Sequence, residues 1–74
     1  MVGTVESVAS FQRPWVRTDA VLGDPTGAVV LRFMGREGVP GIVPGRRLRA
    51  TGTPACTCGR LVILNPLYEF ESRA

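Results

Sequence analysis

Apolar and polar residues alternate along residues 15–22, and a denser apolar stretch follows at residues 28–33. Because successive side chains of a β-strand point to opposite faces, this alternation predicts strands with one buried face. Between the two stretches, Asp24 can accept hydrogen bonds from amides two residues on, Pro25 fixes its own φ, and Gly27 tolerates a positive φ. The pattern therefore predicts a β-hairpin closed by a tight turn.

The two faces of this hairpin differ in character. The face predicted to point into the core contains Thr18, Ala20, Leu22, Val29, Leu31 and Phe33. The opposite face contains Trp15, Arg17, Asp19, Val21, Val30 and Arg32. Arginines combined with an aromatic ring are what single-strand nucleic-acid binders use, so the second face is the candidate working surface.

The remaining strands are predicted from shorter patterns. Residues 2–10 are rich in Val, Thr and Ser, which favours a long first strand, with a bend or bulge at Gly3, over a short helix. Residues 46–53 alternate and predict a fourth strand, whereas the continuous apolar run in residues 60–65 predicts a fifth strand buried on both faces.

The connecting segments contain the residues that interrupt regular structure. Residues 11–14 are predicted to be the first loop, because Pro14 has no amide proton to donate. Residues 34–45 contain four glycines and two prolines, which excludes a stable helix. We expect this segment to cover one end of the core with its apolar members, Val39, Ile42 and Val43.

Two segments near the end of the chain are predicted to lack strand structure of their own. Residues 54–59 are rich in Pro, Cys, Thr and Gly and predict a loop. Residues 67–70 follow Pro66 and are predicted to form an extended tail that packs on the core through Tyr68 and Phe70.

Length and composition limit the class of protein. A chain of 74 residues has room for a single domain, residues 1–74, and a hydrophobic share of 45% argues against disorder. No apolar run approaches the roughly 20 residues of a membrane span, and the N-terminus has neither a basic region nor a cleavable apolar core. We expect a cytoplasmic all-β domain whose short strands close into a barrel.

Five short motifs in a fixed order make the chain similar to a known family. They are residues 3–5 together with 7–8, then 22–27, 33–36, 41–48 and 65–69, with the letters GTV and SV, LGDPTG, FMGR, GIVPGRRL and NPLYE. In these motifs the chain resembles the OB-fold nucleic-acid-binding proteins of actinobacteria. It is more distantly similar to the OB-fold wedge domain of branch-migration helicases and to related tRNA anticodon-binding domains.

The resemblance implies a small five-stranded OB-fold Greek-key barrel. Relatives usually have residues ahead of the segment that begins at Gly3, so the first strand is expected to be shortened here, or its open edge to be covered by another subunit. No helix is expected between strands three and four. Pro25 stands where relatives tend to have glycine, which the turn tolerates if the φ of this residue is negative.

The charge of the chain favours a nucleic-acid partner. All nine basic residues are arginine, the net charge is +3, and the sequence pI is near 9.7. Guanidinium groups fork onto phosphates and stack on bases, which suits nucleic acid; codon bias in a GC-rich genome is the alternative explanation. Arg46, Arg47 and Arg49 form a secondary basic patch, and Arg73 lies away from the predicted face.

The resemblance implies a binding surface on strands two and three, flanked by two loops. The implied nucleic-acid-binding residues are Phe11, Arg13, Trp15, Arg17, Arg32 and Arg60. The two aromatic rings would stack on bases while the arginines contact phosphates. The alternative is that Trp15 packs against the rim of the barrel and the arginines pair with Asp19, Glu6 or solvent.

Features of an enzyme are scarce in this sequence. The chain has no histidine, and Asp24 has a better explanation as a turn former than as a catalyst. Cys56 and Cys58 could supply half of a zinc site, yet four ligands are normally needed, so a metal would require two chains that share the ion. We therefore expect no catalytic residues, no cofactor and no metal, and reduced cysteines in a loop.

The sequence predicts a non-catalytic module that binds single-stranded DNA or RNA weakly and with little sequence preference. The alternative is a protein-interaction or dimerisation module, which docks on a larger DNA repair or replication protein or on a second copy of itself. No membrane partner is expected.

Overall fold

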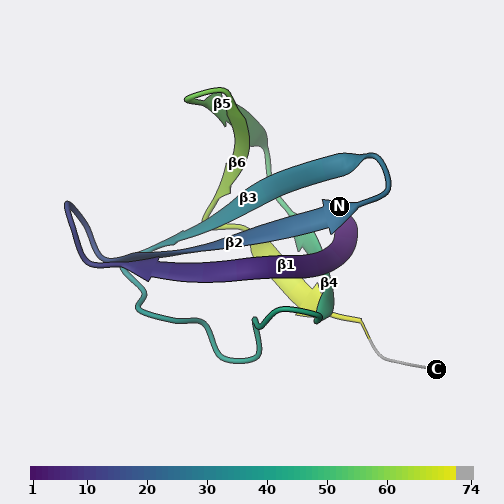
Figure 1. The fold of residues 1–74 in the computed structure, drawn as a ribbon, viewed down its shortest axis with the longest axis horizontal. Coiled ribbons are helices and arrows are strands. Elements are labelled where there is room, and N and C mark those ends of the chain that lie inside the picture. Colours follow the sequence, from purple (N-terminus) through teal and green to yellow (C-terminus); the bar gives the residue numbers. More distant parts are fainter. Residues whose placement is uncertain (72–74) are drawn as a thin grey trace.

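Seven strands in one sheet make up the ordered structure of residues 1–71, the part of the chain that the computed structural model describes (Figure 1). They are β1 (Val2–Phe11), β2 (Arg17–Asp24), β3 (Gly27–Met34), β4 (Arg47–Thr51), β5 (Pro54–Thr57), β6 (Arg60–Leu64) and β7 (Leu67–Phe70). No helix occurs in residues 1–71, and so none that could cross a membrane. The prediction of an all-β domain is confirmed.

The strands follow the order β5-β6-β3-β2-β1-β4-β7, with β5 and β7 at the edges of the sheet. β1, β2 and β3 are antiparallel neighbours, and residues 35–46 then lead to β4, which lies beside β1. Three hairpin-connected strands with the fourth returned beside the first form a Greek key. The sheet has seven strands and open edges where the sequence predicted five strands in a closed barrel.

The β2–β3 hairpin forms as predicted. Asp24 pairs with Gly27, and the Oδ1 atom of Asp24 accepts hydrogen bonds from the amide and hydroxyl of Thr26, at 2.8 and 2.6 Å, and from the amide of Gly27, at 3.1 Å. These bonds satisfy turn amides that would otherwise need water. The turn therefore fixes the register in which the two long strands pair.

β1 contains the predicted bulge, at a different residue. The pairing of β1 with β2 shifts between Val5 and Ser7, which places the extra residue at Glu6 and not at Gly3. Gly3 has another role, because a Cβ atom at this position would lie 2.5 Å from the carbonyl oxygen of Gly23 on β2. The strand also continues one residue beyond its predicted end, to Phe11.

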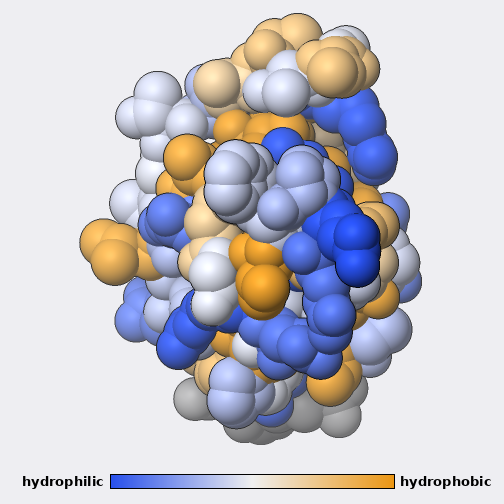
Figure 2. All heavy atoms as spheres, turned by 90° about the vertical axis from the view of Figure 1, so that its left-hand side faces the viewer, coloured by the Kyte–Doolittle hydropathy of each residue, from blue (hydrophilic) through white to orange (hydrophobic). Residues whose placement is uncertain are grey.

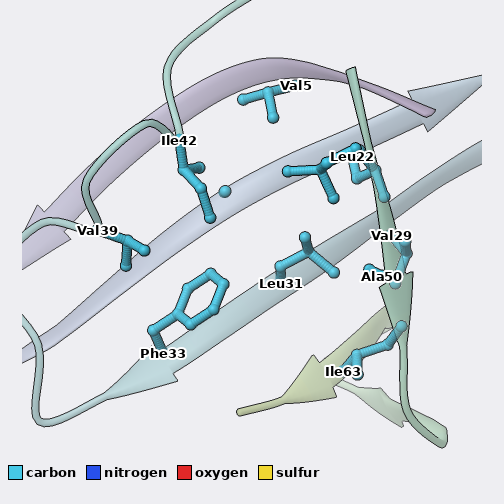
Figure 3. Packing of buried hydrophobic residues seen from close by; sticks show 11 residues of the cluster. Val5, Leu22, Val29, Leu31, Phe33, Val39, Ile42, Ala50 and Ile63 are labelled. Carbon is cyan, nitrogen blue, oxygen red and sulfur yellow. The ribbon is translucent and has the colours of Figure 1, made fainter. Parts of the chain in front are cut away.

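The core lies on one face of the β2–β3 hairpin, as Figure 3 shows. All six residues predicted to point inward from this hairpin are buried. β4 adds Leu48 and Ala50, β6 adds Ile63, and the irregular segment 35–46 adds Val39 and Ile42. Val43, predicted to belong to the same cover, is instead 53% exposed, and it begins a turn in which its carbonyl oxygen accepts from the amide of Arg46 at 3.1 Å.

Thr18 holds the irregular segment against the core. Its hydroxyl donates to the carbonyl oxygen of Arg36 at 2.9 Å and accepts from the amide of Gly38 at 2.7 Å. The hydroxyl of Ser10 lies 3.0 Å away. Since the Thr18 hydroxyl has one proton, already used for Arg36, Ser10 is the donor in this third contact. A segment without regular structure is thus fixed by a buried side chain.

Residues 54–59 do not form the predicted loop. Pro54–Thr57 is a strand, β5, which pairs antiparallel with β6 through a two-residue turn at Cys58 and Gly59. The φ angles of these residues are 51° and 76°, and two positive φ values are what a type I′ hairpin turn requires. The sequence signal was weak because Pro and Cys are not typical strand residues and Asn commonly occupies the first turn position.

The burial predicted for the fifth strand is only half right. Val62 and Ile63 on β6 are buried, whereas Leu61 and Leu64 are 52% and 59% exposed. β6 lies next to the four-residue edge strand β5, whose residues are all exposed, so few side chains cover its ends.

The tail predicted at residues 67–70 packs where expected and forms a strand, β7, which pairs with β4. The ring of Tyr68 lies 5.5 Å from that of Phe33 and 5.8 Å from that of Phe70, both in edge-to-face geometry. The guanidinium of Arg46 lies 4.0 Å from the centre of the Phe70 ring. The aromatic side chains of β7 therefore connect it to β3 and to the irregular segment.

Candidate nucleic-acid interface

The candidate interface is the face of the sheet opposite the core, which we call the outer face. Strand alternation and the pairing registers place the following side chains on it: Phe11 from β1, Arg17, Asp19 and Val21 from β2, Val30 and Arg32 from β3, and Val62 from β6. The residues predicted to lie opposite the core on β2 and β3 are thus on one surface. The β1–β2 loop, residues 12–16, lies at one end of it.

Two of the predicted phosphate contacts are joined by an acidic residue. Arg32 donates from Nε to Oδ1 of Asp19 at 3.0 Å and from Nη2 to Oδ2 at 3.2 Å. Arg17 Nε lies 3.5 Å from the same Oδ2 atom, an ion pair without hydrogen-bond geometry. The hydrogen bonds that Arg32 donates to Asp19 raise the pKa of the Arg32 guanidinium. The three side chains form one cluster of net charge +1.

Phe11 is part of this surface although it does not lie in the loop. It is the last residue of β1 and pairs with Arg17, whose guanidinium lies 4.5 Å from the centre of the Phe11 ring. Arginine over an aromatic face is a favourable cation–π arrangement. With 39% of Phe11 exposed, the ring is accessible but already partly covered.

Trp15 and Arg13 project from the β1–β2 loop. Trp15 is 67% exposed, so it does not pack against the rim in the way the alternative interpretation expects. The amide of Gly35 donates to the carbonyl oxygen of Val16 at 2.7 Å and fixes the end of the loop to the residues that follow β3. Figure 2 shows the end of the molecule with this loop, where hydrophilic and hydrophobic side chains are interspersed.

Arg60 lies at a distance from the other predicted residues. It begins β6, directly after the Cys58–Gly59 turn, and lines a hollow of about 310 Å³ with Val21, Ala28 and Val30. Val62 pairs with Val30, so Arg60 is level with Ala28, four residues along β3 from Arg32. The structure therefore brings five of the six predicted residues to one end and leaves Arg60 near the other.

Sequence reasoning missed Arg36. This residue follows β3, is exposed, and has no carboxylate within 4.0 Å among residues 1–71. Its neighbour Gly35 donates to Val16, so Arg36 follows the residue that is fixed to the end of the β1–β2 loop. The only available signal was its position directly after a strand that was predicted to form the surface.

Two of the three arginines in the secondary basic patch have a carboxylate partner. Arg47 lies 3.5 Å from Glu71 and Arg49 lies 3.9 Å from Glu69, both across the β4–β7 pair. Arg46 stacks on an aromatic ring. These arginines are therefore less able to attract phosphate than those of the loop, and Arg73 lies outside the described residues.

The cysteines are exposed free thiols, one on β5 and one in the turn before β6. Within residues 1–71, no group of three or more acidic, cysteine or histidine side chains is arranged to hold a metal ion.

Comparison of the chain with protein-family models, with curated proteins and with solved structures found no match in any of the three.

Proposed function

We propose that this protein is a non-catalytic module that binds single-stranded DNA or RNA along the outer face, weakly and with little sequence preference. The observation that best supports the proposal is the exposure of Trp15, 67%, in a loop that also presents Arg13. A tryptophan left in water gains nothing for folding, whereas stacking a base on it is worth about 1 to 3 kcal/mol.

The positions of these side chains suggest how single-stranded nucleic acid would be bound. Bases stack on Trp15 and on the open side of the Phe11 ring, while Arg13 and Arg36 contact the adjacent phosphates. Arg17 and Arg32 act differently, because a phosphate must compete with Asp19 for them. Weak binding follows from this competition, and loose sequence preference follows because stacking accepts every base.

We further propose that the sheet is an OB-fold barrel whose last two strands are bent. Only two residues separate β4 from β5, and only two separate β6 from β7. β4 followed by β5 therefore behaves as one long strand, and β6 followed by β7 as another. These two long strands pair with each other, because β4 pairs with β7 and β5 pairs with β6. Counted this way, five strands connect in a ring through the β1–β4 and β3–β6 pairs. We propose in addition that the protein is related to actinobacterial OB-fold proteins and that it is cytoplasmic.

The test is a titration that uses the intrinsic fluorescence of Trp15, the only tryptophan. Oligo-dT and oligo-rU added at low salt should quench or shift the emission, and the affinity should fall steeply when salt is raised, because bound phosphates release counterions. Emission that stays constant at saturating oligonucleotide would show that bases do not stack on Trp15.

A protein-interaction module is the second candidate function. Leu64 and Leu67 are 59% and 75% exposed, which a nucleic-acid groove does not require. Docking on a larger repair or replication protein would bury them. Added salt distinguishes the two functions, because an apolar interface persists at salt concentrations that release phosphates.

A further inference from the structure

The second half of β1 is an open edge. β4 pairs with β1 only from Val2 to Thr4, and Val5 exchanges hydrogen bonds with Gly45 and Arg46. From Ser7 to Phe11, β1 has β2 on one side and, among residues 1–71, no strand on the other. In Figure 1 this part of β1 is the outermost strand beside β2 and β3.

The bulge at Glu6 decides which backbone groups point to this edge. Before the bulge, Met1 directs its terminal ammonium and its carbonyl, and Val5 its amide and its carbonyl, toward the β4 side, so odd-numbered residues face that way. The extra residue reverses the alternation. Val8 and Ser10 therefore present their N–H and C=O groups to the open edge.

This edge lacks the features that protect the other two. β5 is only four residues long and contains Pro54, which cannot donate a hydrogen bond, and β7 contains the acidic Glu69. Residues 7–11 have the sequence SVASF, without a charge, a proline or a glycine. Natural proteins protect their edge strands by such devices, and an unprotected edge is a template for pairing with another strand.

We propose that two copies of this chain pair antiparallel along this edge, with the twofold axis at Ala9. Val8 then forms a hydrogen-bonded pair with Ser10 of the partner subunit, and Ser10 with Val8 of the partner subunit, which gives four backbone hydrogen bonds. The two Ala9 residues face each other as a non-hydrogen-bonded pair, where small side chains allow the closest approach.

Charge favours a second copy over another partner. Glu6 precedes the edge and Arg13 follows it along the chain, and the Glu6 carboxylate lies over Gly23 of β2 on the outer face. An antiparallel pair therefore brings the acidic end of the edge in each copy to the end at which the partner's chain continues to its Arg13. A parallel pair would bring like charges together. The edge is therefore complementary to itself in register, hydrogen bonding and charge.

The pairing would join the β1–β2–β3 parts of two outer faces into one six-stranded surface, because β1 of each copy continues the sheet of the other. A contact of five residues per copy is small, so association is expected to be weak and dependent on protein concentration. The inference rests on the backbone edge and not on nucleic-acid binding, so either can fail without the other.

Cysteine cross-linking tests the register. In a background with Cys56→Ser and Cys58→Ser, Ala9→Cys places two thiols across the axis at about 4.5 Å between Cα atoms, within disulfide range. Ser7→Cys is the matched control, since residue 7 faces residue 11 of the partner and its own counterpart lies about 13 Å away. Under mild oxidation, Ala9→Cys should form covalent dimers at least about tenfold faster than Ser7→Cys.

Sedimentation provides a second measurement without cysteines. The unmodified protein should show a monomer–dimer equilibrium, and Ala9→Lys should abolish it by placing two like charges together at the axis, with an unchanged circular dichroism spectrum. Equal cross-linking of the two cysteine variants, or a protein that is monomeric at every concentration, would overturn the proposal. A protein that remains monomeric alone but is captured through this edge by a different chain would also contradict it.

Discussion

Thr18 shows how a single residue can determine the path of a long segment. It is the only buried polar side chain in residues 1–71, and its hydroxyl group makes three hydrogen bonds. Two of them reach the backbone of the irregular segment, at Arg36 and Gly38. Because a buried polar group without a partner is costly, the segment and the side chain hold each other in place.

We predict that Thr18→Val lowers the free energy of unfolding by about 1 to 3 kcal/mol, because it leaves the Gly38 amide and the Arg36 carbonyl without a partner. Urea denaturation measures this change. Thr51→Val, an exposed position on β4, is the control and should shift stability by less than about 0.5 kcal/mol. Equal effects would show that the hydroxyl of Thr18 has no special role.

Single residues also determine the binding affinity in the proposed function. Trp15→Ala should weaken binding to a labelled oligo-dT by about 1 to 3 kcal/mol, measured by fluorescence anisotropy.

Arg13→Ala should weaken binding to any sequence and reduce the slope of log affinity against log salt by about one. Arg49→Ala, whose arginine is paired with Glu69, is the control for lost net charge. If Arg49→Ala matches Arg13→Ala, the contacts at the loop are not specific.

At the scale of elements, two tight turns determine how the hairpins pair. The β2–β3 turn depends on the side chain of Asp24, whereas the β5–β6 turn depends on backbone conformation at Cys58 and Gly59. The stability of the first turn should therefore depend on pH, and the stability of the second on which residue occupies position 58.

Asp24 gives the β2–β3 turn a pH dependence. The hydroxyl of Thr26, and then its amide, hold the pKa of the Asp24 carboxyl below its usual value of 3.8. A lowered pKa means that the charged form stabilises the folded state above pH 3.8, and that this contribution is lost as the pH falls through the folded-state pKa. Asp24→Asn should flatten the acid side of a plot of melting temperature against pH. An unchanged slope would assign the acid sensitivity to other carboxylates.

The β5–β6 turn can be improved. Cys58→Asn should raise the free energy of unfolding by about 0.5 to 1 kcal/mol, because Asn tolerates a positive φ better than Cys does and Asn-Gly is the preferred type I′ pair. Cys56→Asn, on the neighbouring strand, should give no such gain. Thermal denaturation of both variants under reducing conditions makes the comparison, and a gain in neither would argue against the turn geometry.

At the scale of the whole molecule, β7 and the irregular segment are joined through Phe70. A Cβ atom on Gly41 would lie 2.7 Å from the Phe70 ring, and Arg46 covers the ring at 4.0 Å. The last strand and the long connection before β4 thus stabilise each other, although about 25 to 30 residues separate them in the chain.

Phe70→Ala should therefore lower the free energy of unfolding by about 1 to 3 kcal/mol, since a half-buried ring and its contacts are lost. Leu67→Ala, at a position 75% exposed on the same strand, should cost less than about 0.5 kcal/mol. Chemical denaturation distinguishes these outcomes. A similar cost at both positions would show that β7 contributes through backbone pairing alone.

The sequence predicted the β2–β3 hairpin in detail, with its turn and all of its inward residues, because alternation and turn chemistry are local signals. The absence of a helix between β3 and β4 was also predictable from four glycines and two prolines. The position of the bulge was not, since it depends on how β1 must bend to meet both β2 and β4.

The candidate site was predictable only as a set of residue types. The sequence singled out Trp15 and Arg13, and the structure leaves both exposed. Only the tertiary structure decided that Asp19 holds Arg17 and Arg32, that Arg60 lies apart from them, and that the residue before Arg36 is bonded to the end of the β1–β2 loop. The physical reason is that strand type depends on neighbours along the chain, whereas the neutralisation or availability of a charge depends on which strands pair and in which register.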